Sequence, residues 1–385
     1  MINDIFKSDL LYLLDELDKQ HISLYYSSSR KEILDYIDKL LKTCKYDNYY
    51  DAIYVVKLVL KRLCGNYDQH TKAVFNEYHK LPLRFTYINR SLYLIDVLPE
   101  YKDNLYQKVT SINGVDTTKI LREYFATISN SIPTYKNHLL QNLNFENFLM
   151  LPSIDSNTKV LIFKLENGKE IKVDININYH ITQPSSRIVY KKLSNFVYIK
   201  FPTCMHIEED VKKIVNKIRV AKDRQMMDYL VIDLRDNLGG NDGPLKLIAK
   251  CIKENKIKTY VAVNGGTFSA AAINAYDFKL VGATLVGEEI GEQLTFFGNY
   301  TNDFIELPNT KIKVRGTSKF FYPTSRGLSV IATKKDFKKL NSRYKKIFYL
   351  DVDKEIKTRL IDYKENKDIV MKYIINTEEK NKWII

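Results

Sequence analysis

The spacing of apolar residues divides the chain into three parts that differ in texture. In residues 1–81, leucines and isoleucines recur every three to four positions, as at Leu14 and Leu17. This spacing places them on one face of a helix and predicts amphipathic helices. The apolar run over residues 52–64 predicts a further helix that ends near Gly65. We therefore expect an N-terminal helical segment over residues 1–81.

Residues 82–185 have the shorter apolar runs that are typical of β-strands. Runs over residues 83–88 and 91–98 predict strands, and Asn-Gly pairs at 113–114 and 167–168 predict hairpin turns. A helical pattern lies between the two turns. This part of the chain predicts a small mixed α+β domain.

From residue 186 onward, strand patterns alternate with helix patterns. Strands are predicted over residues 195–201, 228–235, 258–264 and 283–288, and helices over residues 206–222, 244–254 and 268–282. Buried strands separated by helices of this length are typical of a parallel sheet with helical crossovers. We therefore expect residues 186–385 to form an α/β domain.

Composition and charge narrow the classes of function. The 385 residues carry 60 Lys and Arg against 46 Asp and Glu, a net charge of +14, which would suit a nucleic-acid partner. The basic residues are scattered among apolar and acidic ones and no nucleic-acid-binding motif accompanies them, so we expect no nucleic-acid partner. The N-terminus lacks the pattern of a signal peptide, and no apolar run is long enough to span a membrane. We therefore expect a cytoplasmic protein without a membrane partner.

The cysteines give no sign of a metal site. The four of them, Cys44, Cys64, Cys204 and Cys251, are far apart and form no Cys-x-x-Cys pair. Such spacing argues against a zinc site or a dense disulfide framework and favours reduced thiols in the core. We expect no metal and no organic cofactor.

The segment from Asp233 to Gly240, DLRDNLGG, is the first candidate for chemistry. It follows a predicted buried strand, at the end of a parallel sheet where ligands commonly bind. The glycines Gly239 and Gly240 would let backbone N–H groups point into that crevice and stabilise an oxyanion or a phosphate. A tight turn between a strand and a helix is the alternative interpretation of a Gly-Gly pair.

Ser269 is the second candidate, in the stretch NGGTFSAAA. A predicted strand delivers this serine to the start of a helix, where a nucleophile gains exposure, the positive helix terminus and the amide of Ala270 as a donor. The alternative is a serine that only caps the helix. The pattern is not Gly-x-Ser-x-Gly, so it does not indicate a nucleophile elbow of the α/β-hydrolase type.

His70 is the candidate base for such a serine. It lies in NYDQHTK, a polar loop after a helical segment that also carries Asp68 and Thr71. A loop histidine can also be a solvated surface residue without a function. None of the three features is decisive alone.

Taken together in this order, the three features resemble the S41 peptidase family. The resemblance rests on Asp68-Gln69-His70-Thr71 beside the family's D-G-H-T, and on the stretches 233–240, 267–271 and 285–288, which match D-L-R-x-N-x-G-G, T-x-S-A-A and L-V-G-E. The family contains the carboxyl-terminal processing (tail-specific) proteases, the tricorn core protease and the chlamydial secreted protease. Residues 108–120 are similar to part of a PDZ module, although the glycine and aspartate before that part are missing.

The resemblance implies a fold and a mechanism. The implied fold is a Clp-protease/crotonase-like α/β catalytic domain over residues 186–385, preceded by a degenerate PDZ-like domain over 82–185 and the helical segment over 1–81. Some members use a Ser-Lys dyad, but no lysine occurs from Glu288 to Asn309, where that lysine would stand. The His-based solution is therefore favoured, because a neutral imidazole is a competent base near neutral pH.

The resemblance also implies roles for individual residues. Ser269 is expected to be the nucleophile and His70 the general base, with Gly239 or Gly240 and Ala270 forming the oxyanion hole. A carboxylate is expected to orient His70. Glu288 is the first candidate for it, followed by Glu289, Glu292 and Asp68.

The sequence thus predicts a serine peptidase that hydrolyses peptide or protein substrates. Two alternatives stay open: a degenerate protein that keeps the fold as a peptide-binding or interaction module, and a hydrolase of small esters. The substitution of Gln69 for the family's glycine and the worn PDZ-like part favour the first alternative. The oligomeric state is left open.

Overall fold

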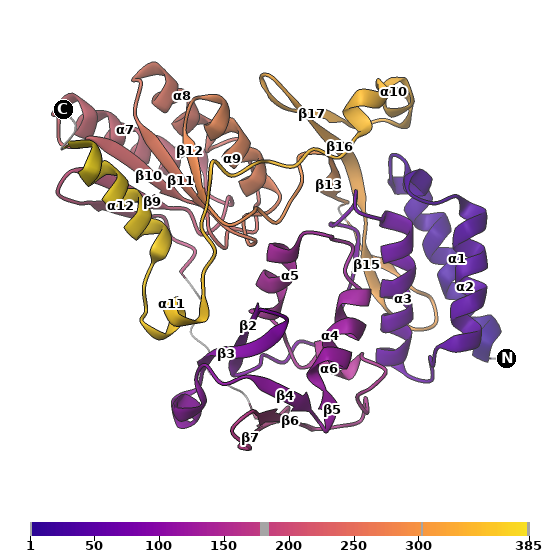
Figure 1. Ribbon diagram of the computed structural model, residues 1–385. Helices are drawn as coiled ribbons and strands as arrows, with labels where there is room; N and C mark the ends of the chain where they lie inside the picture. Colours follow the sequence, from indigo (N-terminus) through magenta and orange to yellow (C-terminus); the bar gives the residue numbers. More distant parts are fainter. Residues whose placement is uncertain (1, 178–184, 302, 383–385) are drawn as a thin grey trace.

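The computed structural model describes residues 2–177, 185–301 and 303–382 (Figure 1). The chain begins with three α-helices, α1 (Ile2–Gln20), α2 (Arg30–Thr43) and α3 (Tyr49–Cys64), which Figure 1 shows side by side in indigo. Local capping defines their ends. Ser29 and Glu32 form a capping box at the start of α2, and Gly65, with a φ of 57°, ends α3 at the predicted position.

The middle part contains a hairpin, a four-stranded sheet and three short helices. The strands are β2 (Leu83–Ile88), β3 (Ser91–Val97), β4 (Val109–Ile112), β5 (Val115–Asp116), β6 (Val160–Leu165) and β7 (Glu170–Asp174); the helices are α4 (Thr117–Ala126), α5 (Pro133–Leu140) and α6 (Glu146–Leu149). Strands β5, β4, β6 and β7 pair antiparallel in that order. Both predicted Asn-Gly turns are present, and Asn113 and Gly114 have φ values of 48° and 78°, as a tight hairpin turn requires.

The N-terminal helices and the middle part share one hydrophobic core. Leu10 of α1, Val56 of α3 and Phe163 of β6 all belong to the same buried cluster. Later segments of the chain also contribute to this core. The strand β15 (Lys313–Arg315) pairs antiparallel with both β1 (Lys72–Val74) and β14 (Ile305–Glu306), which brings β14 and β15 against the core. Apolar packing is therefore continuous across the predicted boundary at residue 81, and the division into three domains stays a prediction.

The last part is built on a six-stranded sheet in the order β18-β12-β11-β10-β9-β8. Its strands are β8 (Val189–Lys192), β9 (Phe196–Lys200), β10 (Tyr229–Asp233), β11 (Thr259–Val263), β12 (Thr284–Gly287) and β18 (Lys354–Glu355). All neighbours are parallel except the edge pair β8–β9, which is antiparallel. The predicted parallel sheet is present, with an antiparallel edge that the sequence analysis did not predict.

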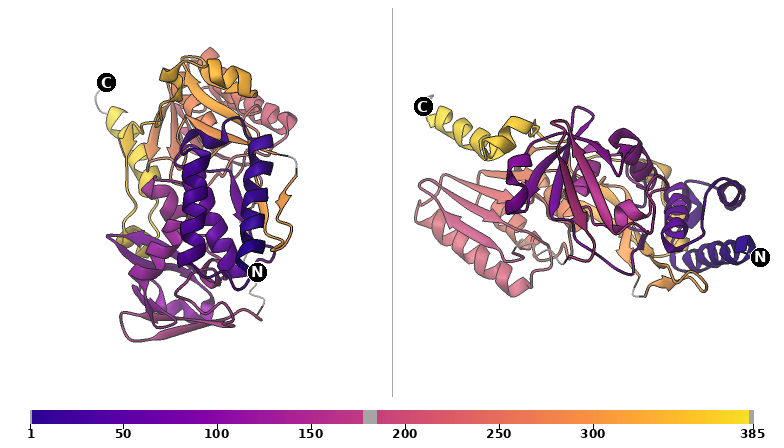
Figure 2. Two further views of the ribbon diagram at one scale, coloured as in Figure 1. Left: turned by 90° about the vertical axis from the view of Figure 1, so that its right-hand side faces the viewer. Right: turned by 90° about the horizontal axis from the view of Figure 1, so that it is seen from below.

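Helices cover both faces of this sheet. The helices α7 (Glu208–Asp223), α8 (Lys246–Glu254) and α9 (Ala270–Leu280) pack on one face, and α12 (Ile369–Lys382) packs on the other. The right-hand view of Figure 2 shows the sheet between α7 in pink and α12 in yellow. Because α9 follows β11 directly, its N-terminus and Ser269 lie at the carboxyl end of the parallel strands.

A three-stranded antiparallel sheet connects the two halves of the molecule, and the sequence analysis did not predict it. Its strands are β13 (Phe296–Tyr300), β16 (Thr317–Thr324) and β17 (Gly327–Ile331). Figure 1 shows it in orange between the α/β part and the N-terminal helices. The remaining helical segments are α10 (Lys334–Lys339), α11 (Leu360–Lys364) and the 3₁₀ turns Leu24–Tyr26, Pro99–Asn104 and Ser342–Lys345. None of the helices in the described ranges is long and apolar enough to cross a membrane.

Candidate active site

Ser269 stands between β11 and α9 in a strained backbone conformation. Its φ and ψ are 55° and −125°, a region that L-residues rarely occupy and that typically costs about 1–3 kcal/mol. The serine occupies the N-cap position, but its side chain makes no capping hydrogen bond. Interpretation of Ser269 as a helix cap therefore fails, because the hydroxyl stabilises no backbone amide of the helix. Strain of this kind persists where the surrounding structure over-determines it, often at functional sites.

The loop after α3 holds His70 through the carboxylate of Asp68. Asp68 Oδ1 accepts hydrogen bonds from the backbone N–H groups of His70 (3.0 Å) and Thr71 (2.8 Å). Asp68 Oδ2 accepts a hydrogen bond from Thr317 Oγ1 at 3.0 Å and lies 3.2 Å from His21 Nε2. His21 Nδ1 accepts from a backbone N–H, so the proton on Nε2 points to Asp68. Asp68 is therefore a structural anchor of the loop.

The His70 ring is buried among aromatic side chains. It stacks against Phe268 and Phe296, with centroid distances of 4.9 and 5.5 Å, and Tyr300 meets it edge-on. Only 2% of His70 is exposed. Burial lowers the pKa of His70 to about 4, so the ring is neutral at pH 7. A neutral, immobilised imidazole has the state that a general base needs.

Ser269 and His70 line the same cavity, which has a volume of about 490 Å³. Neither ring nitrogen of His70 makes a hydrogen bond to any residue of the described ranges, so the Ser269 hydroxyl is not bonded to the imidazole in this structure. Catalytic hydrogen bonds are often loose in empty enzymes and tighten when substrate binds. The predicted Ser-His contact therefore stays a prediction for the substrate complex.

Glu292 is the carboxylate that the structure brings to His70. Its Oε2 atom lies 3.6 Å from His70 Nδ1, and the side chain is completely buried. Burial raises the pKa of Glu292 well above its ordinary value, and the negative charge of Asp68 adds to this effect. Burial therefore disfavours the charged form of both members of this pair.

Glu288, the first candidate for this role in the sequence, lies elsewhere. Its Oε1 atom accepts a hydrogen bond from the backbone N–H of Thr358 (3.0 Å), and it lines a separate cavity. Neither Glu288 nor Glu289 forms an ion pair with His70 in the described part of the chain. Between these two residues and Glu292, Gly291 packs so closely that an added Cβ would lie 2.1 Å from the Gly265 carbonyl oxygen. The chain is buried from Ile290 onward, and Glu292 is the glutamate that lies beside His70.

The predicted oxyanion hole contains two free backbone amides. Gly240 and Ala270 line the cavity, and their N–H groups donate to no acceptor among the described residues. The N–H of Gly239 instead donates to Asn237 Oδ1 at 2.9 Å. Gly239 is still required sterically, because a Cβ there would lie 2.8 Å from Ser269 Cβ. Of the two glycines, Gly240 is therefore the better candidate for the donor.

Buried polar contacts fix the glycine loop. Asn237 Nδ2 donates to the Phe201 carbonyl (2.8 Å), and the Gly239 carbonyl accepts from the Cys204 N–H (2.9 Å). Arg235 bridges Asp233 and Asp368, which ties the loop to α12. These contacts explain the residue types in DLRDNLGG: the charged and amide side chains position the backbone that the glycines shape.

The remaining wall of the catalytic cavity is mostly apolar. Besides the residues already described, it is lined by Met205, Leu238, Ile273, Phe321, Asn299, Asp242 and Arg315. The sequence analysis singled out none of these as site residues, because they come from β13, β15, β16, the helix α9 and loops whose positions follow from tertiary packing. The described residues include no group of three His, Cys, Asp or Glu side chains that could hold a metal ion, and all four cysteines are free.

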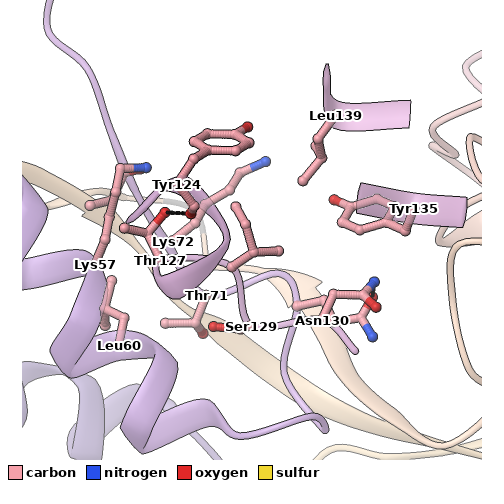
Figure 3. A pocket seen from close by; sticks show the side chains of 13 residues that line it. Lys57, Leu60, Thr71, Lys72, Tyr124, Thr127, Ser129, Asn130, Tyr135 and Leu139 are labelled. Carbon is pink, nitrogen blue, oxygen red and sulfur yellow. Dashed lines mark hydrogen bonds between the residues drawn. The ribbon is translucent and has the colours of Figure 1, made fainter. Parts of the chain in front are cut away.

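A second cavity lies beside the His70 loop. It has a volume of about 180 Å³, and Gln69 and Thr71, the neighbours of His70, line it together with Lys57 and Tyr135. Figure 3 shows Lys57 and Thr127 on one side of it and Tyr135 and Asn130 on the other. The two cavities share no lining residue. Figure 3 therefore shows the surroundings of the loop and not the place where Ser269 would act.

Comparison with known proteins agrees with these features. The model of the peptidase family S41 matches residues 195–262, which include the DLRDNLGG segment. A search of curated protein sequences found no match. Among solved structures, mature CPAF complexed with lactacystin has a TM-score of 0.64 at 13% identity, covering 97% of this chain and 98% of that one. A mutant of CPAF has a TM-score of 0.61 at 10% identity, covering 97% and 98%.

These similarities extend over nearly the whole chain. A further structure of mature CPAF has a TM-score of 0.59 at 11% identity and covers 94% of this chain and 96% of that one. At such low identity the structural similarity shows the fold alone, a mixed α/β fold shared from end to end. The family match and this fold confirm the resemblance to the S41 family that the motifs indicated. The PDZ-like nature of the middle part stays a prediction.

Proposed function

We propose, from the premise that this chain is an S41 family peptidase, that it hydrolyses peptide bonds with Ser269 as the nucleophile. One observation carries the proposal. Ser269 is strained, caps nothing, and opens into a cavity that also contains His70 and the free amides of Gly240 and Ala270. A serine that served only the fold would need neither the strain nor the cavity.

The proposed reaction has two halves. In the first, Ser269 Oγ attacks the peptide carbonyl carbon while His70 takes the hydroxyl proton, and the resulting oxyanion is bound by the amides of Gly240 and Ala270. The C–N bond then breaks, and the leaving amine takes the proton from His70. In the second half, water attacks the acyl-enzyme with His70 again as base, which releases the acid product and restores Ser269.

Electrostatics supports these roles. The helix α9 begins at Ala270, so its positive terminus faces the developing oxyanion. Each amide donor of such a hole typically contributes about 2.7–4 kcal/mol to the stability of the transition state. Glu292 beside His70 Nδ1 can orient the ring and stabilise the imidazolium that forms during the reaction. Peptide or protein substrates follow from this chemistry, and we propose no cofactor.

Labelling with a serine-reactive fluorophosphonate tests the proposal. We expect the wild-type protein to react at one site, and the variants Ser269→Ala and His70→Gln not to react. Ser194→Ala, which removes an exposed serine elsewhere, is the matched control and should react normally. Lactacystin, the compound in one of the CPAF complexes, should compete with the label.

The same experiment distinguishes the alternatives. A folded wild-type protein that does not react would favour a peptide-binding protein without catalysis. Reaction at a serine other than Ser269 would contradict the proposed site. Labelling at Ser269 combined with turnover of small esters, but of no peptide, would favour an esterase.

A further inference from the structure

Arg315 brings a positive charge without a partner to the wall of the catalytic cavity. It comes from β15 and lines the same cavity as Ser269 and His70. Its guanidinium carbon lies 4.7 Å from the ring centroid of Tyr300 and 4.8 Å from that of Phe304. These two rings fix the planar head of the side chain by cation–π contacts.

The charge of Arg315 is not neutralised within the described part of the chain. No carboxylate there lies within ion-pair distance of it, and its buried Nε atom has no hydrogen-bond partner. Buried polar groups are nearly always hydrogen-bonded, because leaving one unpaired is costly. An unpaired guanidinium N–H at a cavity wall therefore indicates a position where a ligand supplies the acceptor.

A second cation stands directly opposite Arg315. In the antiparallel pair of β1 and β15, Lys72 is the register partner of Arg315, and Lys72 Nζ lies 5.5 Å from the centroid of the same Tyr300 ring. Like charges placed opposite each other destabilise a sheet. No described carboxylate forms an ion pair with Lys72 either. Lys72 is exposed and lines the second cavity, so it adds positive potential beside Arg315 without entering the cavity of Ser269.

The other charged group of the cavity does not cancel this potential. Asp242 forms an ion pair with Lys246 on α8. His70 is neutral at pH 7, because burial lowers its pKa to about 4. Most of the remaining wall is apolar, as at Phe296 and Phe321. The volume of about 490 Å³ is large enough for a substrate side chain or chain end.

We propose that Arg315 binds a carboxylate of the peptide substrate in the cavity where Ser269 acts. This inference rests on the proposed function and adds the class of substrate: peptides with a carboxylate close to the scissile bond. The planar guanidinium suits bidentate contact with a carboxylate. The carboxylate can come from an Asp or Glu side chain or from the C-terminus of the peptide, and the two sources share this chemistry.

A set of matched peptides tests the proposal and separates the two sources. The first carries one internal Glu and an amidated C-terminus, the second has Gln in place of that Glu and a free C-terminus, and the third has Gln and an amidated C-terminus. Binding to the full-length Ser269→Ala variant is measured by fluorescence polarisation, and cleavage by the wild-type protein is measured by mass spectrometry. We expect the first or second peptide to bind and be cleaved roughly 10- to 100-fold better than the third.

Variants identify the residue responsible. Arg315→Gln, combined with Ser269→Ala for the binding measurement, should abolish the preference, and Arg315→Lys should retain part of it, because the charge remains without the planar fork. Arg326→Gln, an exposed arginine in the β16–β17 turn, is the matched control and should keep the full preference. Thermal unfolding checks that each variant is folded, and the Arg315→Lys result decides if Arg315→Gln fails to fold.

The possible failures are distinguishable. Equal binding and cleavage of all three peptides, or a preference that survives Arg315→Gln, would overturn the carboxylate site and leave the peptidase proposal intact. A preference in binding that depends on Arg315, without cleavage of any peptide by the wild-type protein, would support the carboxylate site and contradict the peptidase.

Discussion

Glu292 Oε2 lies 3.6 Å from His70 Nδ1, with 0% of Glu292 and 2% of His70 exposed. Burial disfavours the charged form of both partners: it lowers the pKa of His70 to about 4 and raises the pKa of Glu292 well above its ordinary value. A charge on either residue is therefore costly in this site. Formation of the imidazolium during catalysis becomes favourable only if Glu292 supplies a compensating negative charge or a hydrogen bond.

Glu292→Gln should reduce catalysis more than stability. The substitution keeps the shape of the side chain but removes the acid, so the transition state loses the group that stabilises the imidazolium. We expect the rate of fluorophosphonate labelling to fall by roughly 10²–10⁴-fold, the range typical of acid–base and orienting groups. Labelling rates and thermal unfolding of both proteins measure the two effects.

Glu288→Gln is the matched control for this prediction. Glu288 accepts a hydrogen bond from the Thr358 backbone and lines another cavity, so its substitution should leave the labelling rate within about twofold, since the site itself is not touched. A loss of labelling in Glu288→Gln with normal labelling in Glu292→Gln would reverse the assignment made from the structure.

The pH dependence of labelling should reflect the buried histidine. His70 acts as a base only when neutral, and it is neutral at pH values above its pKa of about 4. The rate should therefore stay constant as the pH falls from 8 to about 5, and decline only below that. A histidine with the ordinary pKa near 6.5 would already lose half of its activity at about pH 6.5 and nearly all of it at about pH 5. A midpoint between pH 6 and 7, in protein shown to be folded by circular dichroism, would contradict the burial argument.

Local pattern and spacing predicted much of the fold. The strands at β9, β10, β11 and β12 and the helices between them were predicted because buried apolar runs and amphipathic stripes alternate there. The end of α3 at Gly65 and the turn at Asn113-Gly114 follow from residues that tolerate positive φ. These signals are local, so the sequence alone carries them.

The surroundings of the nucleophile could not be predicted in this way. Glu292 was ranked behind Glu288 because tertiary packing, such as the close approach of Gly291 to Gly265, decides which glutamate lies beside His70, and no local pattern reports such packing. Arg315 reaches the site only because β15 pairs with β1 across more than 240 residues of chain. The candidates Ser269 and His70 were found because their motifs are contiguous; their common cavity is a result of tertiary structure.

Gly239→Ala should abolish labelling, whereas Gly282→Ala should not. Both glycines have a positive φ, 96° and 92°, so alanine costs about 1–2 kcal/mol of backbone strain at either position. A Cβ at Gly239 would in addition lie 2.8 Å from Ser269 Cβ and from the amide nitrogen of Ala270, and nothing lies within 4 Å of a Cβ at Gly282. The melting temperature should fall in both variants, whereas the labelling rate should fall only in Gly239→Ala. Equal labelling rates of Gly239→Ala and Gly282→Ala would show that the loop of Gly239 can shift to accommodate the Cβ without displacing Ser269.

Asp68→Ala should destabilise the protein by about 3–5 kcal/mol, because Asp68 is a buried charge with several partners. Burial alone would raise the pKa of Asp68, but the hydrogen bonds from His21 and Thr71 hold it below its ordinary value, so the group is ionised at pH 7. Its removal leaves the N–H groups of His70 and Thr71 and the His21 ring without their acceptor.

The matched control is Asp116→Ala, which removes an exposed carboxylate that accepts the Thr118 N–H at the start of α4. Loss of such a cap typically costs about 1 kcal/mol. Urea unfolding measures both variants, and labelling should fall only in Asp68→Ala, since only that change frees the His70 loop. If Asp68→Ala cost no more than Asp116→Ala and kept its labelling, the buried network around Asp68 would not be what positions His70, and the packing of the ring against Phe268 and Phe296 would have to suffice.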